Sequence, residues 1–291
     1  MSIVNAQKAM KRAAELRTQI NIHNDAYYNM DNPTISDAAY DALVRELEQL
    51  ESEYPELADS ASPTAHVGGT AQSAFAKVRH RVPLLSLRDV FSKDEAWDWV
   101  KQINAGGHTT YVVEEKVDGL SIAITYVNGI YTSAATRGDG AIGEDVTENA
   151  RQIPSIPKVI KDRTLYANTL IVRAEVIMPV AAFERLNEEL EREGKKLIAN
   201  PRNGAAGALR TKDPSITAKR GLEAVAFDVL YDSDGEASGR ETQRQDNIFL
   251  QQIGFKTVSC TICTTLKELE SAIDAIDTTR GSRPYWVEAP L

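Results

Sequence analysis

The chain has 291 residues, of which 42% are apolar and 26% are charged, and its formal net charge is −9. This length and composition are typical of a globular protein with one large domain or two unequal ones. No apolar run is long enough to span a bilayer, and the N-terminus lacks the apolar core of a signal peptide. We therefore expect a cytoplasmic protein without membrane partners. The acidic balance argues against a chain-wide electrostatic clamp for nucleic acid.

The first 60 residues predict helices. Ser36 is a favourable N-cap, and Asp37 falls in the first turn, where the helix dipole favours an acid. The apolar residues that follow recur at helical spacing, namely Tyr40, Leu43, Val44, Leu47 and Leu50. Proline and small polar residues then break the pattern, so we place a linker at residues 60–75. Residues 1–75 carry five basic against eleven acidic side chains, which favours a cationic ligand or a basic partner.

From residue 80 onward, the pattern changes to strands interleaved with helices. A helix is predicted at residues 179–193, and strands are predicted at 110–114, 120–126, 129–136, 170–178, 225–231 and 255–263. Val127-Asn128-Gly129 is a hairpin turn signal. Hairpin-linked strands followed by helices indicate an α+β fold with antiparallel sheets. We expect a small helical domain at residues 1–70 and a larger domain at residues 71–291.

Lys116 stands in Glu114-Glu115-Lys116-Val117-Asp118-Gly119, after a predicted strand and before a turn dipeptide. A strand end would project its amine into a cleft. A lysine is a nucleophile only in its neutral form, which burial or neighbouring cations favour. The alternative is a surface lysine beside a hairpin turn, and K-x-D-G by itself does not decide between the two.

Residues 136–145 place Arg137 at a strand end, followed by a glycine-rich loop whose backbone can approach a phosphate closely. Residues 138–143 also satisfy G-x-G-x-x-G, which raises a dinucleotide-fold dehydrogenase as an alternative. That fold needs an acidic residue about 20 positions further on, at the end of a second parallel strand. The region in question reads Ile156-Pro157-Lys158-Val159-Ile160-Lys161-Asp162, so the dehydrogenase is the weaker interpretation.

Several other charged residues and the two cysteines could have either a functional or a structural role. Glu175 stands in an otherwise apolar strand, where an acid needs a partner or a ligand. A glycine- and alanine-rich segment presents Arg202 and Arg210, which suit phosphate. A structural ion pair is the alternative for each of these three. Cys260 and Cys263 supply two of the four ligands of a structural zinc, so we expect unremarkable strand cysteines in a reducing compartment and no metal held by protein ligands.

Taken in chain order, these segments resemble the bacterial NAD-dependent DNA ligases. E-x-K-x-D-G, A-A-T-R-G-D-G-x-x-G-E-D, R-x-E-V and N-P-R-N-x-A-A-G-x-L-R occur in the order found in that family. Residues 27–41 are similar to its small helical domain, which grips the nicotinamide mononucleotide half of NAD. There, Asp37, Tyr40 and Asp41 share one helical face, and carboxylates with tyrosines suit a cationic aromatic ring. ATP-dependent ligases share K-x-D-G but not this domain, so the resemblance implies NAD as the cofactor.

The resemblance also implies a mechanism. Lys116 would attack the α-phosphorus of NAD, expel nicotinamide mononucleotide and carry AMP. The AMP would then pass to a 5′-phosphate at a nick in double-stranded DNA, with Mg²⁺ offsetting the phosphate charge. The resemblance implies contacts with adenine by Ser86, Leu87 and Glu114, with ribose and phosphate by Arg137 and Glu175, and with phosphate or DNA by Arg202 and Arg210. It implies contacts with the nicotinamide nucleotide by Tyr27, Tyr28, Asp37, Tyr40 and Asp41. Asp118 and Gly119 match the remaining positions of K-x-D-G.

The sequence departs from the family pattern at three places. Ala174 replaces a glycine common in the R-G-E strand, and Arg88-Asp89 replaces the usual Asp-Asn. After residues 283–291 neither the family's D-G-x-V-x-K strand, its next lysine nor its later DNA-binding modules follow. We therefore expect an adenylation domain that is truncated or split at its C-terminus and reaches nicked DNA through modules absent here. The alternative is an NAD-binding subunit of a split ligase, inactive without a second chain.

Overall fold

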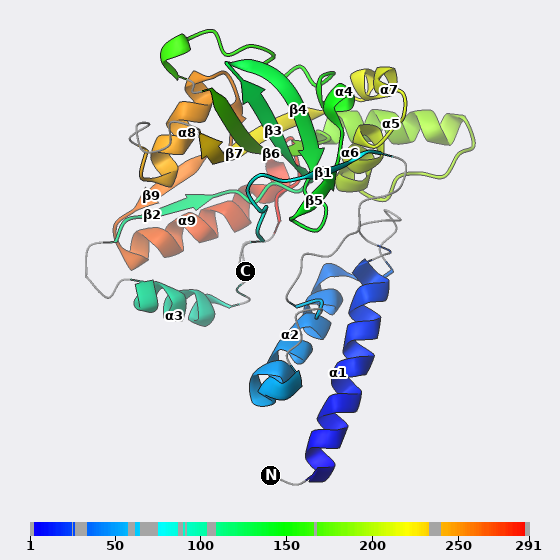
Figure 1. The fold of residues 1–291 in the computed structure, drawn as a ribbon, viewed down its shortest axis with the longest axis vertical. Coiled ribbons are helices and arrows are strands. Elements are labelled where there is room, and N and C mark those ends of the chain that lie inside the picture. The colour runs from blue at the N-terminus through cyan, green and yellow to red at the C-terminus, as the bar shows by residue number, and fades with distance from the viewer. Residues whose placement is uncertain are drawn as a thin grey trace. The chain divides into compact units, whose positions relative to one another are not determined.

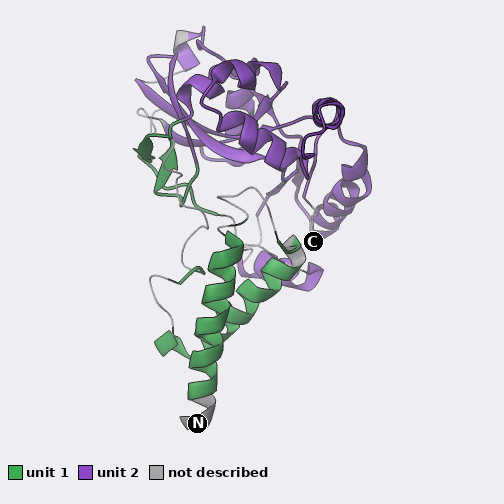
Figure 2. Ribbon diagram, turned by 90° about the vertical axis from the view of Figure 1, so that its right-hand side faces the viewer, with its two compact units in different colours: residues 1–86, 137–145 green, residues 87–136, 146–291 purple. Residues whose placement is uncertain are grey.

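The computed structural model describes residues 3–24, 26, 34–57, 62–64, 75–86, 90, 92–103, 109–165, 168–232 and 240–288. The chain divides into a first unit, Met1–Ser86 with Arg137–Asp145, and a second unit, Leu87–Thr136 with Val146–Leu291 (Figure 2). Helices and mostly antiparallel sheets together confirm the predicted α+β class. Most of the predicted linker lies outside the described residues, so the domain boundary near residue 70 stays a prediction. No helix in the described ranges is long and apolar enough to cross a membrane.

Two helices, α1 (Ile3–Asn24) and α2 (Asp37–Glu53), make up most of the first unit (Figure 1). The Ser36 hydroxyl caps α2 by accepting a hydrogen bond of 3.3 Å from the backbone of Ala39, which confirms the predicted cap. A short 3₁₀ turn (Pro55–Leu57) follows. The apolar faces of these elements close into a core that includes Ala13, Leu16, Ile20, Leu47 and Leu57. The apolar residues that recur at helical spacing in the sequence therefore line the face of α2 that packs against α1.

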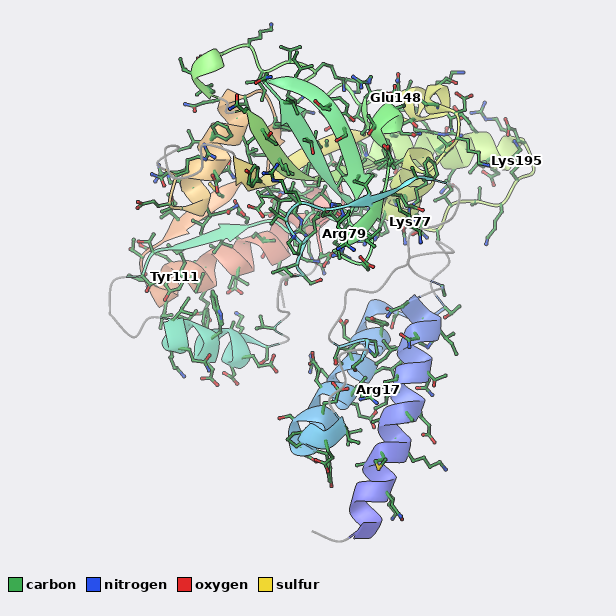
Figure 3. All side chains as sticks on the ribbon, viewed as in Figure 1. Arg17, Lys77, Arg79, Tyr111, Glu148 and Lys195 are labelled. Carbon is green, nitrogen blue, oxygen red and sulfur yellow. The ribbon has the colours of Figure 1, made fainter. Side chains whose placement is uncertain are left out.

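Two arginines of α1 join it to α2. Arg12 donates two hydrogen bonds of 2.6 Å to the carboxylate of Glu46. Arg17, which projects from α1 beside α2 (Figure 3), donates one of 2.8 Å to Glu51. Bidentate arginine–carboxylate geometry fixes orientation as well as charge. The two pairs therefore hold the helices in register.

The first unit also holds a two-stranded antiparallel sheet of β1 (Lys77–Arg79) and β5 (Ile142–Glu144). Gly138, in the loop that leads into β5, has a φ of +57°, and a Cβ there would lie 1.9 Å from the carbonyl oxygen of Ile142. Only glycine fits that conformation and that space. Residues 138–143 thus lead into an antiparallel strand and open no helix, which removes the dinucleotide-fold interpretation.

A five-stranded sheet with the order β4-β3-β6-β7-β8 forms the centre of the second unit (Figure 1). Neighbouring strands are antiparallel except for the parallel pair β7–β8. Asn128 and Gly129 both have positive φ in the β3–β4 turn, as the hairpin signal predicted. The strands are β3 (Leu120–Val127), β4 (Ile130–Thr136), β6 (Thr169–Ile177), β7 (Glu223–Asp232) and β8 (Lys256–Thr257).

One face of this sheet is apolar and covered by helices, and the other carries polar side chains. Ile122, Val172 and Ala226 belong to the buried face, whereas Ser121 and Arg173 point the opposite way. The predicted helix at residues 179–193 is confirmed as α5. The helices on this side are α4 (Thr147–Ala150), α5 (Val180–Arg192), α6 (Pro201–Leu209), α7 (Pro214–Lys219) and α8 (Gln243–Gln252); a 3₁₀ turn (Arg163–Leu165) precedes β6.

A second ladder pairs β2 (Tyr111–Glu114) with β9 (Cys260–Cys263), and α9 (Leu266–Thr279) packs against it (Figure 1). Helix α3 (Lys93–Ile103) adds Val100 to the same core, and a 3₁₀ turn (Arg280–Ser282) follows α9. The prediction of one strand at residues 255–263 was wrong. The segment divides at Val258, whose buried side chain packs with Val117, Ile177 and Val225, so that β8 extends the large sheet and β9 pairs with β2.

Tyr111, at the start of β2 (Figure 3), is 7% exposed, and its hydroxyl has no hydrogen-bond partner within the described part of the chain. A buried hydroxyl without a partner costs about 1–3 kcal/mol. We therefore expect Tyr111→Phe to leave the free energy of unfolding unchanged or to raise it by about 1 kcal/mol, measured by urea denaturation. A loss of stability above about 1 kcal/mol would show that the hydroxyl has a partner.

Candidate active site at Lys116

Lys116 lies in the connection from β2 to β3, which forms a short antiparallel ladder with residues 286–288. The backbone of Glu288 donates to the carbonyl of Lys116 at 2.9 Å, and that of Asp118 donates to the carbonyl of Trp286 at 3.0 Å. Val117 and Val287 form the bridge between these two bonds. The sequence analysis placed Lys116 before a turn, whereas its backbone is held in an extended ladder.

The Lys116 side chain is 52% exposed, and its ammonium group forms an ion pair with the Glu288 carboxylate. Lys116 and Glu288 stand opposite each other in the ladder, which places both side chains on the same side. Burial or neighbouring cations were expected around this lysine. The structure instead gives it an anionic partner and contact with solvent.

Asp118 stands two residues after Lys116 and accepts a hydrogen bond of 3.0 Å from Arg202 of α6. Both side chains are less than one-fifth exposed. Burial raises the pKa of the Asp118 carboxyl and outweighs the opposing effect of Arg202, and the charge of Glu288 adds to the rise. Arg202 thus forms an ion pair with the aspartate of the K-x-D-G segment, and its assignment to phosphate stays a prediction.

Gly119 allows the K-x-D-G segment to lie against β6. A Cβ at this position would lie 2.3 Å from the carbonyl oxygen of Val176 and 3.0 Å from the Cγ of Glu175. The residue does not have positive φ, so the requirement for glycine comes from this close approach and not from a turn. Gly119 thus fixes the distance between the lysine segment and the strand that carries Glu175.

Glu115 is 6% exposed and was passed over in the sequence analysis. Its carboxylate accepts from Arg283 at 2.5 Å and from the hydroxyl of Tyr285 at 2.8 Å. Burial, and then the bond to Glu115, raise the pKa of Tyr285 to about 12. Because both partners lie some 170 residues away along the chain, no local pattern could have identified them. Glu115 holds residues 283–288 against the Lys116 segment.

We expect Glu115→Ala to lower the free energy of unfolding by about 2 kcal/mol, because it leaves Arg283 and Tyr285 without their acceptor. The Arg283 side chain is 36% exposed, so water reduces the loss below that of a fully buried pair. Glu115→Gln keeps an acceptor for Tyr285 and should lose about half as much. Urea denaturation of both variants checks this order, and equal midpoints for Glu115→Ala and the unaltered chain would contradict it.

Glu114, at the end of β2, faces helix α8. Its carboxylate accepts from the side-chain amides of Gln243 at 3.1 Å and Asn247 at 3.2 Å. Burial raises the pKa of Glu114, and the two amides oppose this rise. Neither amide was predicted as a site residue, because α8 lies about 130 residues further along the chain.

The polar face of the large sheet carries Glu175 directly opposite Ser121. Arg173 stands two residues before Glu175 on the same side, donates to the Ser121 hydroxyl at 3.3 Å and lies 5.2 Å over the ring of Phe227. Arg173 and Phe227 were missed in the sequence analysis. Arg173 and Phe227 stand on the neighbouring strands β6 and β7, so their contact could be predicted only once the register of these strands is known.

The remaining predicted positions fall into two groups. Ser86, Arg137, Tyr40 and Asp41 belong to the first unit, where the Tyr40 hydroxyl donates to Asn24 at 2.6 Å. Arg210 follows α6 in the second unit. Three positions lie outside the described residues, as does the side chain of a fourth: Tyr27, Tyr28, Leu87 and, for the side chain, Asp37.

Comparison with known protein families shows which family the chain belongs to. Residues 72–289 match the family described as NAD-dependent DNA ligase adenylation domain. The chain belongs to the NAD-dependent DNA ligase family. Residues 6–68 match the description DNA ligase-like, N-terminal NAD+-binding domain, so both parts of this ligase-family chain have a counterpart.

Individual relatives agree with this membership. The DNA ligases of Caldicellulosiruptor saccharolyticus and Thermoanaerobacter sp. are each 44% identical over 285 residues, covering 97% of this chain and 41% and 42% of their own lengths. That of Marinobacter nauticus is 48% identical over 223 residues, or 75% of this chain and 33% of its own. The chain thus spans about two-fifths of the length of the first two relatives. A solved structure of an ATP-dependent DNA ligase from bacteriophage T7 in complex with ATP aligns over 70% of this chain and 64% of the phage chain. The sequence identity is 16% and the TM-score is 0.36, so this likeness supports no conclusion about the fold or the function.

Proposed function

We propose that this chain is the adenylation module of an NAD-dependent DNA ligase and that Lys116 is its nucleophile. The observation that supports this most directly is the Lys116–Glu288 pair, an accessible amine with a carboxylate in contact. The groups around it are fixed by partners of their own, Asp118 by Arg202 and Glu115 by Arg283. An amine held in a defined position next to a proton acceptor is suited to attack on phosphorus.

In the proposed step, Glu288 accepts a proton from the Lys116 Nζ, which then attacks the α-phosphorus of NAD. A nitrogen–phosphorus bond forms, the bond from the α-phosphorus to the bridging oxygen breaks, and nicotinamide mononucleotide leaves with the electron pair. The nitrogen then gives up a second proton to solvent. AMP remains on Lys116. In the subsequent reaction we expect AMP to pass to the 5′-phosphate of nicked double-stranded DNA, where the 3′-hydroxyl displaces it. We further propose that the protein contacts nicked DNA through additional C-terminal modules. If the ligase is split, a second subunit would supply them.

Side chains on the polar face of the large sheet, together with Glu114 at the end of β2, fit the adenosine half of NAD. Phe227 offers a ring on which a base can stack, the Glu114 carboxylate accepts from an amine, and Glu175 can accept from ribose hydroxyls. Arg173, above the Phe227 ring, supplies a cation. We assign Ser86 and Leu87 to the adenine, Arg137 to ribose and phosphate, Arg202 and Arg210 to phosphate or DNA, and Tyr27, Tyr28, Asp37, Tyr40 and Asp41 to the nicotinamide nucleotide.

Mg²⁺ is part of the proposed reaction because charge develops on the diphosphate as the bond breaks. The described residues contain no group of three or more His, Cys, Asp and Glu side chains that could hold a metal ion. Mg²⁺ commonly binds through one or two carboxylates together with substrate phosphates. Asp118 is the carboxylate beside Lys116 that suits this role, because Glu288 is assigned the lysine proton. A cytoplasmic location, where NAD is plentiful, accords with the proposal.

The test is to incubate the chain with NAD and Mg²⁺ and measure its intact mass. We expect one added AMP, assigned to Lys116 by peptide mapping, together with release of one equivalent of nicotinamide mononucleotide. ATP in place of NAD should give no adduct. If calorimetry shows NAD binding but no adduct forms, the chain is an NAD-binding module that requires a partner, and the proposed self-adenylation is wrong.

A further inference from the structure

Two side-chain amides from α8 meet at the carboxylate of Glu114. Gln243 Nε2 lies 3.4 Å from one Glu114 oxygen, Oε1, and 3.1 Å from the other, Oε2. It also donates to the backbone carbonyl of Phe227 at 2.6 Å. Asn247 Nδ2 donates to Oε1 at 3.2 Å. Asn247 is 2% exposed, so this contact forms away from solvent.

The contacts around Asn247 determine which way its amide points. Its Nδ2 faces two acceptors, Glu114 and the carbonyl of Val258, at 3.2 and 3.4 Å. Its Oδ1 accepts from Gln251 at 3.0 Å, and Gln251 donates in turn to Thr257 at 2.8 Å. A reversed amide would oppose two oxygens to its own oxygen. Asn247 is therefore held as a donor toward Glu114.

Among the described residues, these bonds leave one side of the carboxylate available. An ionised carboxylate has about four lone-pair positions. The two amides make two contacts on Oε1 and one on Oε2. Oε2 can therefore accept a further hydrogen bond from a ligand, while the two amides fix the orientation of the Glu114 carboxylate. Such a carboxylate can accept from a ligand amine but has no proton to donate to a ligand carbonyl.

We propose that Gln243 and Asn247 are positioning residues that hold Glu114 as a pure acceptor, and that they thereby set the preference for adenine over hypoxanthine in the dinucleotide. This inference rests on the proposed function, because it takes Glu114 to face the base. Adenine presents an amine where hypoxanthine presents a carbonyl oxygen. A carboxylate binds the first and repels the second, and a site built for one hydrogen-bonding group discriminates strongly against its replacement.

The electrostatics of Glu114 explain why such positioning is needed. Burial raises the pKa of this carboxyl, the amides of Asn247 and Gln243 lower it, and the nearby carboxyl of Asp228 on β7 raises it further. Without the amides, Glu114 would take up a proton at a higher pH. A protonated Glu114 can donate to the carbonyl of hypoxanthine. Removing the amides should therefore weaken discrimination, and the more so the lower the pH.

The test compares NAD with nicotinamide hypoxanthine dinucleotide as AMP and IMP donors to Lys116, by intact mass over time, between about pH 5 and pH 8. Gln243→Met keeps the length of the side chain and removes the donor, and Asn247→Leu does the same at the buried position. Gln252→Met, on the exposed side of the same helix, is the matched control. We expect the NAD-to-hypoxanthine rate ratio to fall about tenfold in the first two variants at the lower pH, and to stay unchanged in the control. Gln243→His, which can still donate, should restore part of the ratio.

The outcomes separate this inference from the function on which it rests. If the unaltered chain forms no adduct with NAD, the proposed function fails. If it forms the adduct but Gln243→Met leaves the rate ratio and its pH profile unchanged, the positioning role is wrong. A purely structural effect would lower both rates equally and leave their ratio intact, which also counts against the inference. Gln243→Met decides the matter if Asn247→Leu unfolds, because Gln243 is only partly buried.

Discussion

Lys116→Arg is expected to abolish AMP transfer to the chain while leaving its fold intact. Arginine keeps the positive charge and can keep the pair with Glu288, but its guanidinium does not lose a proton in proteins and so provides no nucleophile. Loss of a nucleophile commonly reduces turnover by a factor of at least about a thousand. Intact mass after incubation with NAD should therefore show no adduct, whereas the unfolding midpoint should be unchanged because the side chain is half exposed.

Lys195→Arg provides the matched control for this substitution. Lys195 is 65% exposed and pairs with Glu193 at 2.7 Å, so it repeats the environment of Lys116 in the connection that follows α5 (Figure 3). That variant should form the adduct at the rate of the unaltered chain. If Lys116→Arg still gains one AMP, another residue is the nucleophile and the assignment of Lys116 is wrong.

Gly119→Ala is expected to lower the free energy of unfolding by about 3 kcal/mol and to slow AMP transfer sharply. The new methyl group would lie 2.3 Å from the carbonyl oxygen of Val176, and a backbone atom within a sheet cannot move aside as a flexible side chain can. The strain should push the Lys116 segment away from β6. Urea denaturation and the time course of adduct formation measure the two effects.

Gly207→Ala serves as a control of opposite sign. Gly207 lies within α6, and a Cβ there would meet no atom within 4 Å. Alanine in a helix is favoured over glycine by about 1 kcal/mol, so this variant should be slightly more stable and equally active. If Gly119→Ala is as stable as Gly207→Ala, the close approach to β6 does not constrain the site.

Local features of the fold could be predicted from the sequence because their causes lie within a few residues. Ser36 and the apolar spacing after it fixed the start and the buried face of α2. Asn128 and Gly129 fixed the β3–β4 hairpin. The division of residues 255–263 could not be predicted, because it depends on Val258 filling a space lined by Val117, Ile177 and Val225. That space exists only once distant strands have assembled.

The candidate site shows the same limit. The motif around Lys116 predicts the lysine as the nucleophile, but the groups that orient its surroundings come from far along the chain. Arg202 is 84 residues from Asp118, and Glu288 is 172 residues from Lys116. Pairing over such distances leaves no periodicity to read. The resemblance to a family supplied Asp118 and Arg202 as candidate positions, whereas Glu288 became a candidate only through its contact with Lys116 in the structure.

The β2–β9 ladder has a practical consequence for following the site in solution. The sequence contains two cysteines, and Cys260 stands opposite Glu114 in the ladder while Cys263 is fully buried. Burial raises the pKa of the Cys263 thiol, which lowers its reactivity toward alkylating reagents. A maleimide fluorophore should therefore react first with Cys260. The unaltered chain thus offers a single optical label one strand away from the carboxylate assigned to adenine, and its emission should change when the base site fills.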